Sequence, residues 1–229
     1  MRQANKGGLG TWLVEAYLRR KMRQAFRGVW LSGTLPRPPG GLLVYANHTS
    51  WWDGFVVHAL GQAAGWDAYA LMEEKNLQRY PFLGRIGAFG VRPGEAGSSL
   101  LALRYASGLL RRPRAAVFWF PEGEIRPFGE SPLRLSRGVQ VLARMAQASC
   151  CSLGIRYAFF EAEKPDVLLE VGPVHPPAPL STFQEELAAR VASLARRTRL
   201  DGLQQLLAGA PGVAERWDAV RGLPGGGTA

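Results

Sequence analysis

The sequence of 229 residues has few cysteines and histidines, and both shortages limit what the protein can be. Its two cysteines, Cys150 and Cys151, are neighbours on a predicted strand and point to opposite faces, so we expect two reduced thiols, as in a cytoplasmic protein. Of its three histidines, His58 and His175 have no partners at metal-ligand spacing, which favours structural or solvated roles. A Gly-x-Ser-x-Gly motif is missing, which argues against a serine hydrolase.

Long apolar runs are also missing. No stretch supplies the roughly 18 to 20 nearly uncharged residues that a membrane-spanning helix requires, and the apolar region of a secretory signal is lacking. An apolar content of 47% with 20% charged residues is nevertheless typical of an ordered globular protein, and the length suits one domain. The segment 223–229 has nothing to bury, and we expect a disordered tail there.

Acidic residues are scarce relative to basic ones. Lys and Arg number 28 against 18 Asp and Glu, and the formal net charge of +10 attracts nucleic acid, an acidic membrane surface or a phosphorylated ligand. Only four of the basic residues are lysines, a bias that a GC-rich bacterial genome would also produce. No nucleic-acid-binding motif accompanies the charge, so we expect no nucleic-acid partner.

The basic residues concentrate near the N-terminus, in a segment that we expect to form one or two amphipathic helices over Leu9–Leu31. Its basic members are Arg19, Arg20, Lys21, Arg23 and Arg27. Its apolar face consists of Leu9, Trp12, Leu13, Ala16 and Tyr17. Aromatic side chains beside arginines favour a helix that lies on an anionic membrane, here the inner face of the cell membrane. The alternative is a helix packed on the domain, with its arginines in solvent.

The rest of the chain alternates short apolar runs with longer amphipathic stretches. We expect strands at Leu42–Tyr45, Ala68–Leu71, Phe89–Val91, Ala116–Phe120, Cys151–Tyr157 and Val167–Val171. We expect helices at Trp51–Ala64, Ala96–Arg112, Leu135–Ala148 and Phe183–Arg197, and short helices at Leu203–Leu207 and Val213–Val220. This alternation predicts an α/β fold, with one domain at 35–200 built on a mostly parallel or mixed sheet flanked by helices. The basic helical segment 1–34 precedes it, and the short helices and tail of 201–229 follow.

The most informative motif is Asn47-His48-Thr49-Ser50-Trp51-Trp52-Asp53, at the end of a predicted strand. A carboxylate that aligns a neutral imidazole lets it take a proton from an alcohol at neutral pH. His48 and Asp53 can meet only if His48 precedes the helix, because residues five apart on one helix face different ways. Ser50 with Asp53 three positions later is typical of a cap that starts the helix there. Capping alone would also explain Asp53.

A second polar loop, Pro121-Glu122-Gly123-Glu124-Ile125-Arg126-Pro127, follows the strand predicted at Ala116–Phe120. The carboxyl ends of parallel strands meet at one edge of a sheet, so Glu122 and Arg126 are expected near His48. Taken alone, the loop could equally be an ordinary turn with solvated charges.

Together and in this order, these motifs resemble the glycerolipid acyltransferase superfamily, whose best-known members are the lysophosphatidate acyltransferases. Its first block, Asn-His-x-x-x-x-Asp, is matched by Asn47, His48 and Asp53. Its further blocks are matched by Gly87–Arg92, Phe120–Gly123 and the Arg137-Gly138 step that opens the next helix. The resemblance covers roughly residues 35–172.

The resemblance implies an O-acyltransferase of phospholipid biosynthesis that moves a fatty acyl group from acyl-CoA or an acyl-carrier protein to a lipid-like hydroxyl, with no bound cofactor and no metal. His48 would be the general base and Asp53 would orient it. Substrate binding would fall to Arg92, Glu122, Gly123 and Arg126. Backbone N–H groups near Gly123 would stabilise the oxyanion.

Departures from the family pattern leave the acceptor open. Arg126 comes one position late, because Glu124 and Ile125 stand where the family usually has Thr and Arg. Ser152 stands near the usual proline of the fourth block. Lysophosphatidate, another lysolipid and a glycolipid all remain candidates. The alternatives to an acyltransferase are a non-catalytic peripheral membrane protein that binds lipid and an acyl thioesterase.

Overall fold

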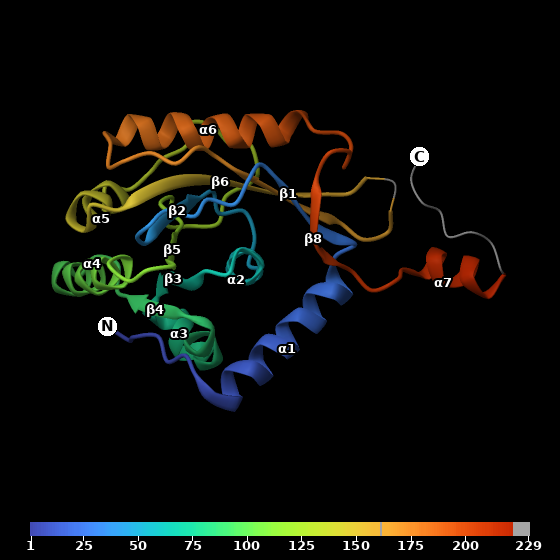
Figure 1. The fold of residues 1–229 in the computed structure, drawn as a ribbon, viewed down its shortest axis with the longest axis horizontal. Helices are drawn as coiled ribbons and strands as arrows, with labels where there is room; N and C mark the ends of the chain where they lie inside the picture. The colour runs from blue at the N-terminus through green and yellow to red at the C-terminus, as the bar shows by residue number, and fades with distance from the viewer. Residues whose placement is uncertain (161, 222–229) are drawn as a thin grey trace.

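The residues that the structure describes, 1–160 and 162–221, fold around one eight-stranded mixed sheet, shown in Figure 1 as a computed structural model. The tail predicted at 223–229 lies outside these residues. In chain order the elements are α1 (Gly8–Ala25), β1 (Gly28–Ser32), β2 (Leu42–Ala46), α2 (Asp53–Ala64), β3 (Asp67–Glu73), α3 (Glu74–Arg79), the 3-10 helix η1 (Pro81–Ile86), β4 (Ala88–Val91), α4 (Ala96–Leu110), β5 (Ala115–Trp119), α5 (Gly138–Ala146), β6 (Ser149–Ala158), β7 (Asp166–Val171), α6 (Leu180–Arg196), β8 (Gln204–Ala208) and α7 (Val213–Val220).

The strands lie in the order β4-β3-β5-β2-β6-β7-β1-β8. The first five of these are parallel to one another, β7 is antiparallel to β6, β1 is parallel to β7, and β8 is antiparallel to β1. The carboxyl ends of β2, β5, β3 and β4 therefore lie at the same edge of the sheet. The predicted α/β fold, with one mixed sheet flanked by helices, is confirmed.

The central strands β2 and β5 are buried along their whole length. Successive side chains of a strand point to opposite faces, so both faces of β2 must be apolar. Leu42 and Val44 join the core beneath α1 and α2, whereas Leu43 and Tyr45 join the core beneath α4, α5 and α6. Figure 1 shows α6 and α1 on opposite sides of the sheet. Two apolar layers thus fix β2, whose end carries the His48 motif.

The prediction of helix over the whole of Leu9–Leu31 is wrong for its last residues. The helix α1 stops at Ala25, Phe26 has extended backbone angles, and β1 follows from Gly28. The strand β1 lies beside β7, and its Val, Trp and Leu side chains suit a half-buried pleated surface. Pairing with β7 therefore decides the structure of this segment.

Arg27 consequently does not belong to the basic surface of the helix. Its guanidinium forms an ion pair of 2.7 Å with the Asp166 carboxylate, which is fully buried, and the Trp30 indole N–H donates to that carboxylate at 2.7 Å. A buried carboxylate needs such partners, so Arg27 has a structural role.

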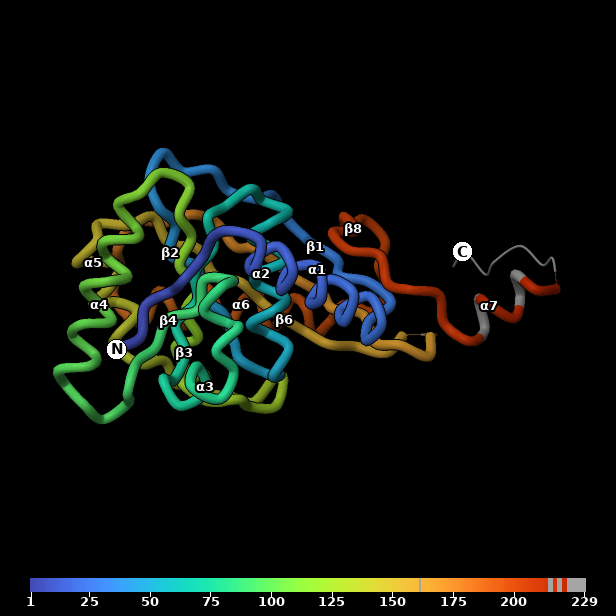
Figure 2. Tube along the Cα trace, turned by 90° about the horizontal axis from the view of Figure 1, so that it is seen from below, coloured from blue at the N-terminus to red at the C-terminus, as the bar shows by residue number. Residues whose placement is uncertain are grey.

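The helix predicted at Leu203–Leu207 is also wrong, because these residues lie largely within β8. This strand pairs antiparallel with β1 and covers its otherwise free edge. A helix of five residues is marginal by itself, and the ladder hydrogen bonds offered by β1 outweigh that weak preference. The predicted helix Val213–Val220 is confirmed as α7, which Figures 1 and 2 show reaching away from the body of the molecule.

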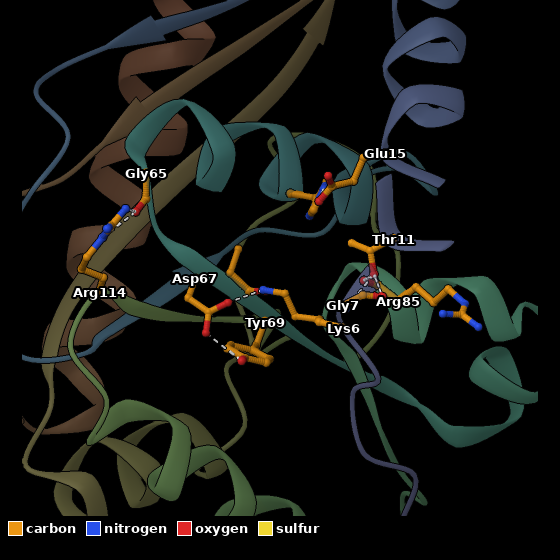
Figure 3. A network of polar contacts seen from close by, with 11 residues as sticks. Lys6, Gly7, Thr11, Glu15, Gly65, Asp67, Tyr69, Arg85 and Arg114 are labelled. Atoms are coloured by element: carbon orange, nitrogen blue, oxygen red, sulfur yellow. Dashed lines mark hydrogen bonds and ion pairs between the residues drawn. The ribbon is translucent and has the colours of Figure 1, made fainter. Parts of the chain in front are cut away.

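The start of α1 is tied to the domain by a polar network that Figure 3 shows. The Lys6 ammonium contacts the Asp67 carboxylate and donates to the Ala68 carbonyl at 3.1 Å. The Thr11 hydroxyl donates to the carbonyl oxygen of Arg85 at 3.1 Å. These contacts join the N-terminal segment to β3 and η1, and so fix which face of α1 meets solvent.

That solvent face is apolar in its first half. Leu18 and Met22 point into the core, whereas Trp12 is 62% exposed and Leu13 is 53% exposed. The apolar face that the sequence spacing identifies is thus turned outward. No described helix, α1 included, is both long and apolar enough to cross a bilayer.

Candidate active site

Asn47 fixes the loop that leaves β2. Its side-chain N–H donates to the Ile155 carbonyl at 2.9 Å, and the Ile155 N–H donates to the Asn47 side-chain oxygen at 2.8 Å. Asn47 is buried, so this reciprocal pair satisfies its amide and continues the pairing of β2 with β6 for one more residue. The loop therefore turns at His48, where the chain leaves the sheet.

His48 and Asp53 are in contact. The distance from His48 Nδ1 to Asp53 Oδ2 is 2.7 Å, and the carboxylate is fully buried while the imidazole keeps 23% of its surface exposed. The Nδ1–H that donates to the carboxylate leaves Nε2 with its lone pair. No hydrogen bond to Nε2 occurs among residues 1–160 and 162–221. The exposed nitrogen can accept a proton from a bound hydroxyl.

The helix that follows starts later than the capping pattern predicts. It begins at Asp53 instead of Trp51, and Ser50 is not its N-cap; the Ser50 hydroxyl accepts from the Trp52 N–H at 3.2 Å within the preceding turn. The Asp53 carboxylate also accepts the N–H groups of Thr49 and Ser50 at 2.7 and 3.0 Å. Asp53 thus accepts hydrogen bonds from the loop and from His48 at the same time. Its role at the helix start and its contact with His48, which the sequence offers as alternatives, occur together.

Residues at the end of β5 and in the loop that follows it contact the same histidine. The Phe120 ring stacks on the imidazole with centroids 4.5 Å apart and planes 28° apart. The Arg126 N–H donates to the His48 carbonyl at 2.8 Å, and the His48 N–H donates to Glu122 Oε2 at 3.3 Å. Adjacent parallel strands thus deliver both loops to one place, as the sequence predicts for Glu122 and Arg126.

Glu122 is an acid in an unfavourable place for a negative charge. Burial raises the pKa of its carboxyl group, while the His48 N–H and the positive charge of Arg126 act in the opposite direction. The Arg126 guanidinium is itself held by Glu130 and lies 3.8 Å from Glu124. Arg126 therefore carries its own counter-charges, and a substrate phosphate would have to compete with them.

Gly123 shapes the turn that presents Glu122. Its φ of +77° lies in the left-handed region, which glycine adopts without strain. Its N–H donates to the Phe120 carbonyl at 3.1 Å, so in this conformation that N–H is occupied by the turn. Gly123 thus contributes its backbone conformation here.

Arg92 follows β4, at the same edge of the sheet as the end of β2. The strands β4 and β2 are three positions apart in the sheet, which at the usual strand spacing separates them by about 14 Å. Its guanidinium contacts Glu74 at 3.1 Å and Glu95 at 3.0 Å, and the side chain is about half exposed. The structure thus places Arg92 at the same edge of the sheet as His48, three strands away.

Sequence reasoning missed Tyr157. Its hydroxyl, on β6, donates to Asp53 Oδ1 at 2.6 Å, opposite the oxygen that meets His48. Tyr157 comes 104 residues after Asp53 and belongs to no motif, so only the pairing of β6 beside β2 reveals it.

The other histidines and the cysteines have no contact with this site. His58 is buried 3.4 Å from Glu15, and the Tyr45 hydroxyl lies 2.9 Å from His175 Nε2. Both cysteines are free and buried. Within the described ranges, no group of three or more His, Cys, Asp or Glu side chains could hold a metal ion.

Comparisons with known proteins identify the family and the fold. The acyltransferase family model matches residues 29–156, more than half of the chain. The crystal structure of PlsC from Thermotoga maritima, a 1-acyl-sn-glycerophosphate acyltransferase, superimposes with a TM-score of 0.53 at 18% identity, over 82% of this chain and 77% of that one. No curated protein matches the sequence significantly. The fold is thus similar to that of PlsC, and the chain belongs to the acyltransferase family, as its motifs predict for an O-acyltransferase.

Proposed function

We propose that this protein transfers a fatty acyl group from a thioester to the hydroxyl of a lipid-like acceptor, with His48 as the general base. One observation carries the proposal: the 2.7 Å contact between His48 Nδ1 and the buried Asp53 carboxylate, at the edge of the sheet where a second polar loop closes. A non-catalytic lipid-binding protein would have no use for such an oriented imidazole.

The reaction needs no covalent enzyme intermediate. The acceptor O–H gives its proton to His48 Nε2, and the oxygen attacks the thioester carbonyl. The tetrahedral intermediate then collapses, the C–S bond breaks, and the leaving thiolate takes the proton from the imidazolium. Asp53 holds the reactive tautomer and stabilises the imidazolium while it exists. Such base catalysis contributes about 100- to 10,000-fold.

The acceptor would extend from His48 along the strand ends toward Arg92. A lysophosphatidate would place its hydroxyl at His48 and its phosphate near Arg92, whose side chain is about half exposed and whose guanidinium it would share with Glu74 and Glu95. Glu122 and Arg126 would line the path between them, and N–H groups of the loop around Gly123 would face the oxyanion. The donor would be acyl-CoA or an acylated carrier protein, and neither a cofactor nor a metal would take part.

The enzyme would work at the inner face of the cell membrane, bound through α1. The exposed large apolar side chains of α1 are Leu9, Trp12, Leu13 and Tyr17. The exposed basic side chains that follow them are Arg19, Arg20, Lys21 and Arg23. Apolar residues that enter the lipid next to cations that meet its phosphates favour such binding.

Product analysis with an acyl-CoA and a panel of lysolipids and glycolipids tests the proposal. We expect transfer by the wild type, none by His48→Ala, and full transfer by the matched control His175→Ala. Retained transfer by a folded His48→Ala protein would remove the proposed base. Release of free fatty acid with no acylated product would instead identify a thioesterase.

A further inference from the structure

We propose that Tyr157 is a positioning residue of the active site, which locks the Asp53 carboxylate so that His48 is held in its reactive orientation. This inference rests on the proposed function of the His48–Asp53 pair. It concerns a side chain outside the sequence motifs, on a strand that reaches the site only through the fold.

The Asp53 carboxylate is fully buried, so no solvent can satisfy its oxygens. Its Oδ2 accepts three hydrogen bonds, from His48 Nδ1–H and from the N–H groups of Thr49 and Ser50. Its Oδ1 has one described donor, the Tyr157 hydroxyl at 2.6 Å. Without that hydroxyl a buried charged oxygen would be left without a partner, which is among the costlier defects in a protein interior.

Two-sided anchoring also fixes the rotation of the carboxylate. With Oδ1 held by Tyr157, the group cannot turn about its terminal torsion, and Oδ2 stays directed at the imidazole. A carboxylate held only through the three hydrogen bonds to Oδ2 could still pivot about that oxygen, and the angle of the His48 ring would follow it. Precise placement of the base matters because small displacements in a reacting geometry reduce the rate steeply.

Tyr157 is suited to be a permanent donor. Its ring is partly buried against Phe26, with centroids 5.7 Å apart. Burial raises the pKa of the phenol, and the neighbouring Asp53 charge raises it further, so the hydroxyl keeps its proton at any pH at which the enzyme would work. It therefore donates to the carboxylate and does not take part in proton transfer.

The variant Tyr157→Phe removes the hydroxyl and keeps the ring against Phe26. We expect kcat to fall about 10- to 150-fold, the range that corresponds to a hydrogen bond to a charged group, with KM for both substrates unchanged. The matched control is Tyr45→Phe, since the Tyr45 hydroxyl is also buried but bonds to His175. It should lose stability without losing kcat. If both variants behave alike, the proposal is overturned.

A titration of the His48 imidazole by NMR gives a readout that does not depend on activity. Asp53 with one donor fewer attracts the imidazolium more strongly, so we expect the His48 titration and the acidic limb of the kcat/KM profile to move upward by about 0.5 to 1 pH unit in Tyr157→Phe. The titratable groups that contact His48 are Asp53 on α2 and Glu122 in the loop after β5. Behind them, Tyr157 on β6 contacts Asp53, and the charges of Arg126 and Glu130 act on Glu122. Observation of the ring itself separates its titration from that of Glu122.

A second variant works even if Tyr157→Phe does not fold. Incorporation of 3-fluorotyrosine at position 157 keeps the hydroxyl and makes it a stronger donor, so the His48 titration should move in the opposite direction, to lower pH. An unchanged titration would overturn the proposal. If the wild type transfers no acyl group, yet the two variants show these opposite titration shifts, the proposed function is defeated and the role of Tyr157 stays intact.

Discussion

The backbone N–H of His48 lies 3.3 Å from Oε2 of Glu122, so two loops that are 74 residues apart in sequence share a hydrogen bond at the active site. The same partly buried carboxyl group thereby supports the loop that carries His48. Its ionisation is consequently coupled to the stability of the folded protein.

Replacement of Glu122 by glutamine should stabilise the protein more at neutral pH than at acidic pH. Burial raises the pKa of Glu122 in the folded state, so its stabilising contribution is present below the unfolded value, near 4.5, and is lost as the pH rises through the folded value. Glutamine has no such loss. Thermal melts of wild type and Glu122→Gln between pH 3.5 and about 7.5 would measure this. A difference in Tm that stays constant across this range, or that exposed Glu185→Gln reproduces, contradicts the prediction.

Replacement of Asp53 by asparagine should lower kcat by about 100- to 10,000-fold. The neutral amide can donate to Nδ1 and so stabilise the wrong tautomer, and it cannot stabilise the imidazolium. Steady-state kinetics on protein shown to be folded by circular dichroism provides the measurement. A loss smaller than about tenfold would mean that Asp53 mainly organises the loop through Thr49 and Ser50.

Removal of the Arg92 side chain should discriminate between acceptors. We expect Arg92→Ala to raise KM about tenfold for a phosphate-bearing lysolipid and less than about twofold for a neutral glycolipid, because only the phosphate gains a charge-assisted hydrogen bond. Arg104→Ala, which removes an exposed arginine from α4, is the matched control. Equal losses for both acceptors would tell against a phosphate role for Arg92.

The outward face of α1 should govern binding to membranes. The double variant Trp12→Glu with Leu13→Glu replaces exposed apolar surface by charge, and we expect its affinity for anionic vesicles to fall at least about tenfold. Co-sedimentation with phosphatidylglycerol vesicles measures this. Leu101→Glu on α4, where the leucine is 52% exposed, is the control and should bind as the wild type does. Unchanged binding by the double variant would reject α1 as the contact.

The centre of the fold could be predicted because its signals are local. The runs that form β2 and β5 are apolar at every position, as strands buried on both faces must be, and each ends in a motif. The contact of His48 with Asp53 followed from their spacing and from the helix start, even though that start is two residues later than predicted.

The strands β1 and β8 and the contact of Tyr157 with Asp53 could not be predicted from local patterns. The strands β1 and β8 depend on pairing with each other and with β7, which no local pattern reports, although the sequence Gly28-Val29-Trp30-Leu31 favours a strand. Tyr157 and the partners of Arg126 are likewise tertiary features. The predicted division of the chain at residues 34 and 200 stays a prediction, and both outer segments contribute strands to the sheet.

Phe26 directly follows α1. Its ring lies 5.1 Å, centroid to centroid, from that of Trp52, which precedes α2, and 5.7 Å from that of Tyr157. The N-terminal segment is therefore not a detachable anchor. Trimming the chain before residue 28 to obtain a better-behaved sample for crystallisation or screening would remove the Phe26 ring that packs against Trp52 and Tyr157, beside the buried Asp53 carboxylate. Such a shortened protein would be a poor substitute for the whole enzyme in any inhibitor search.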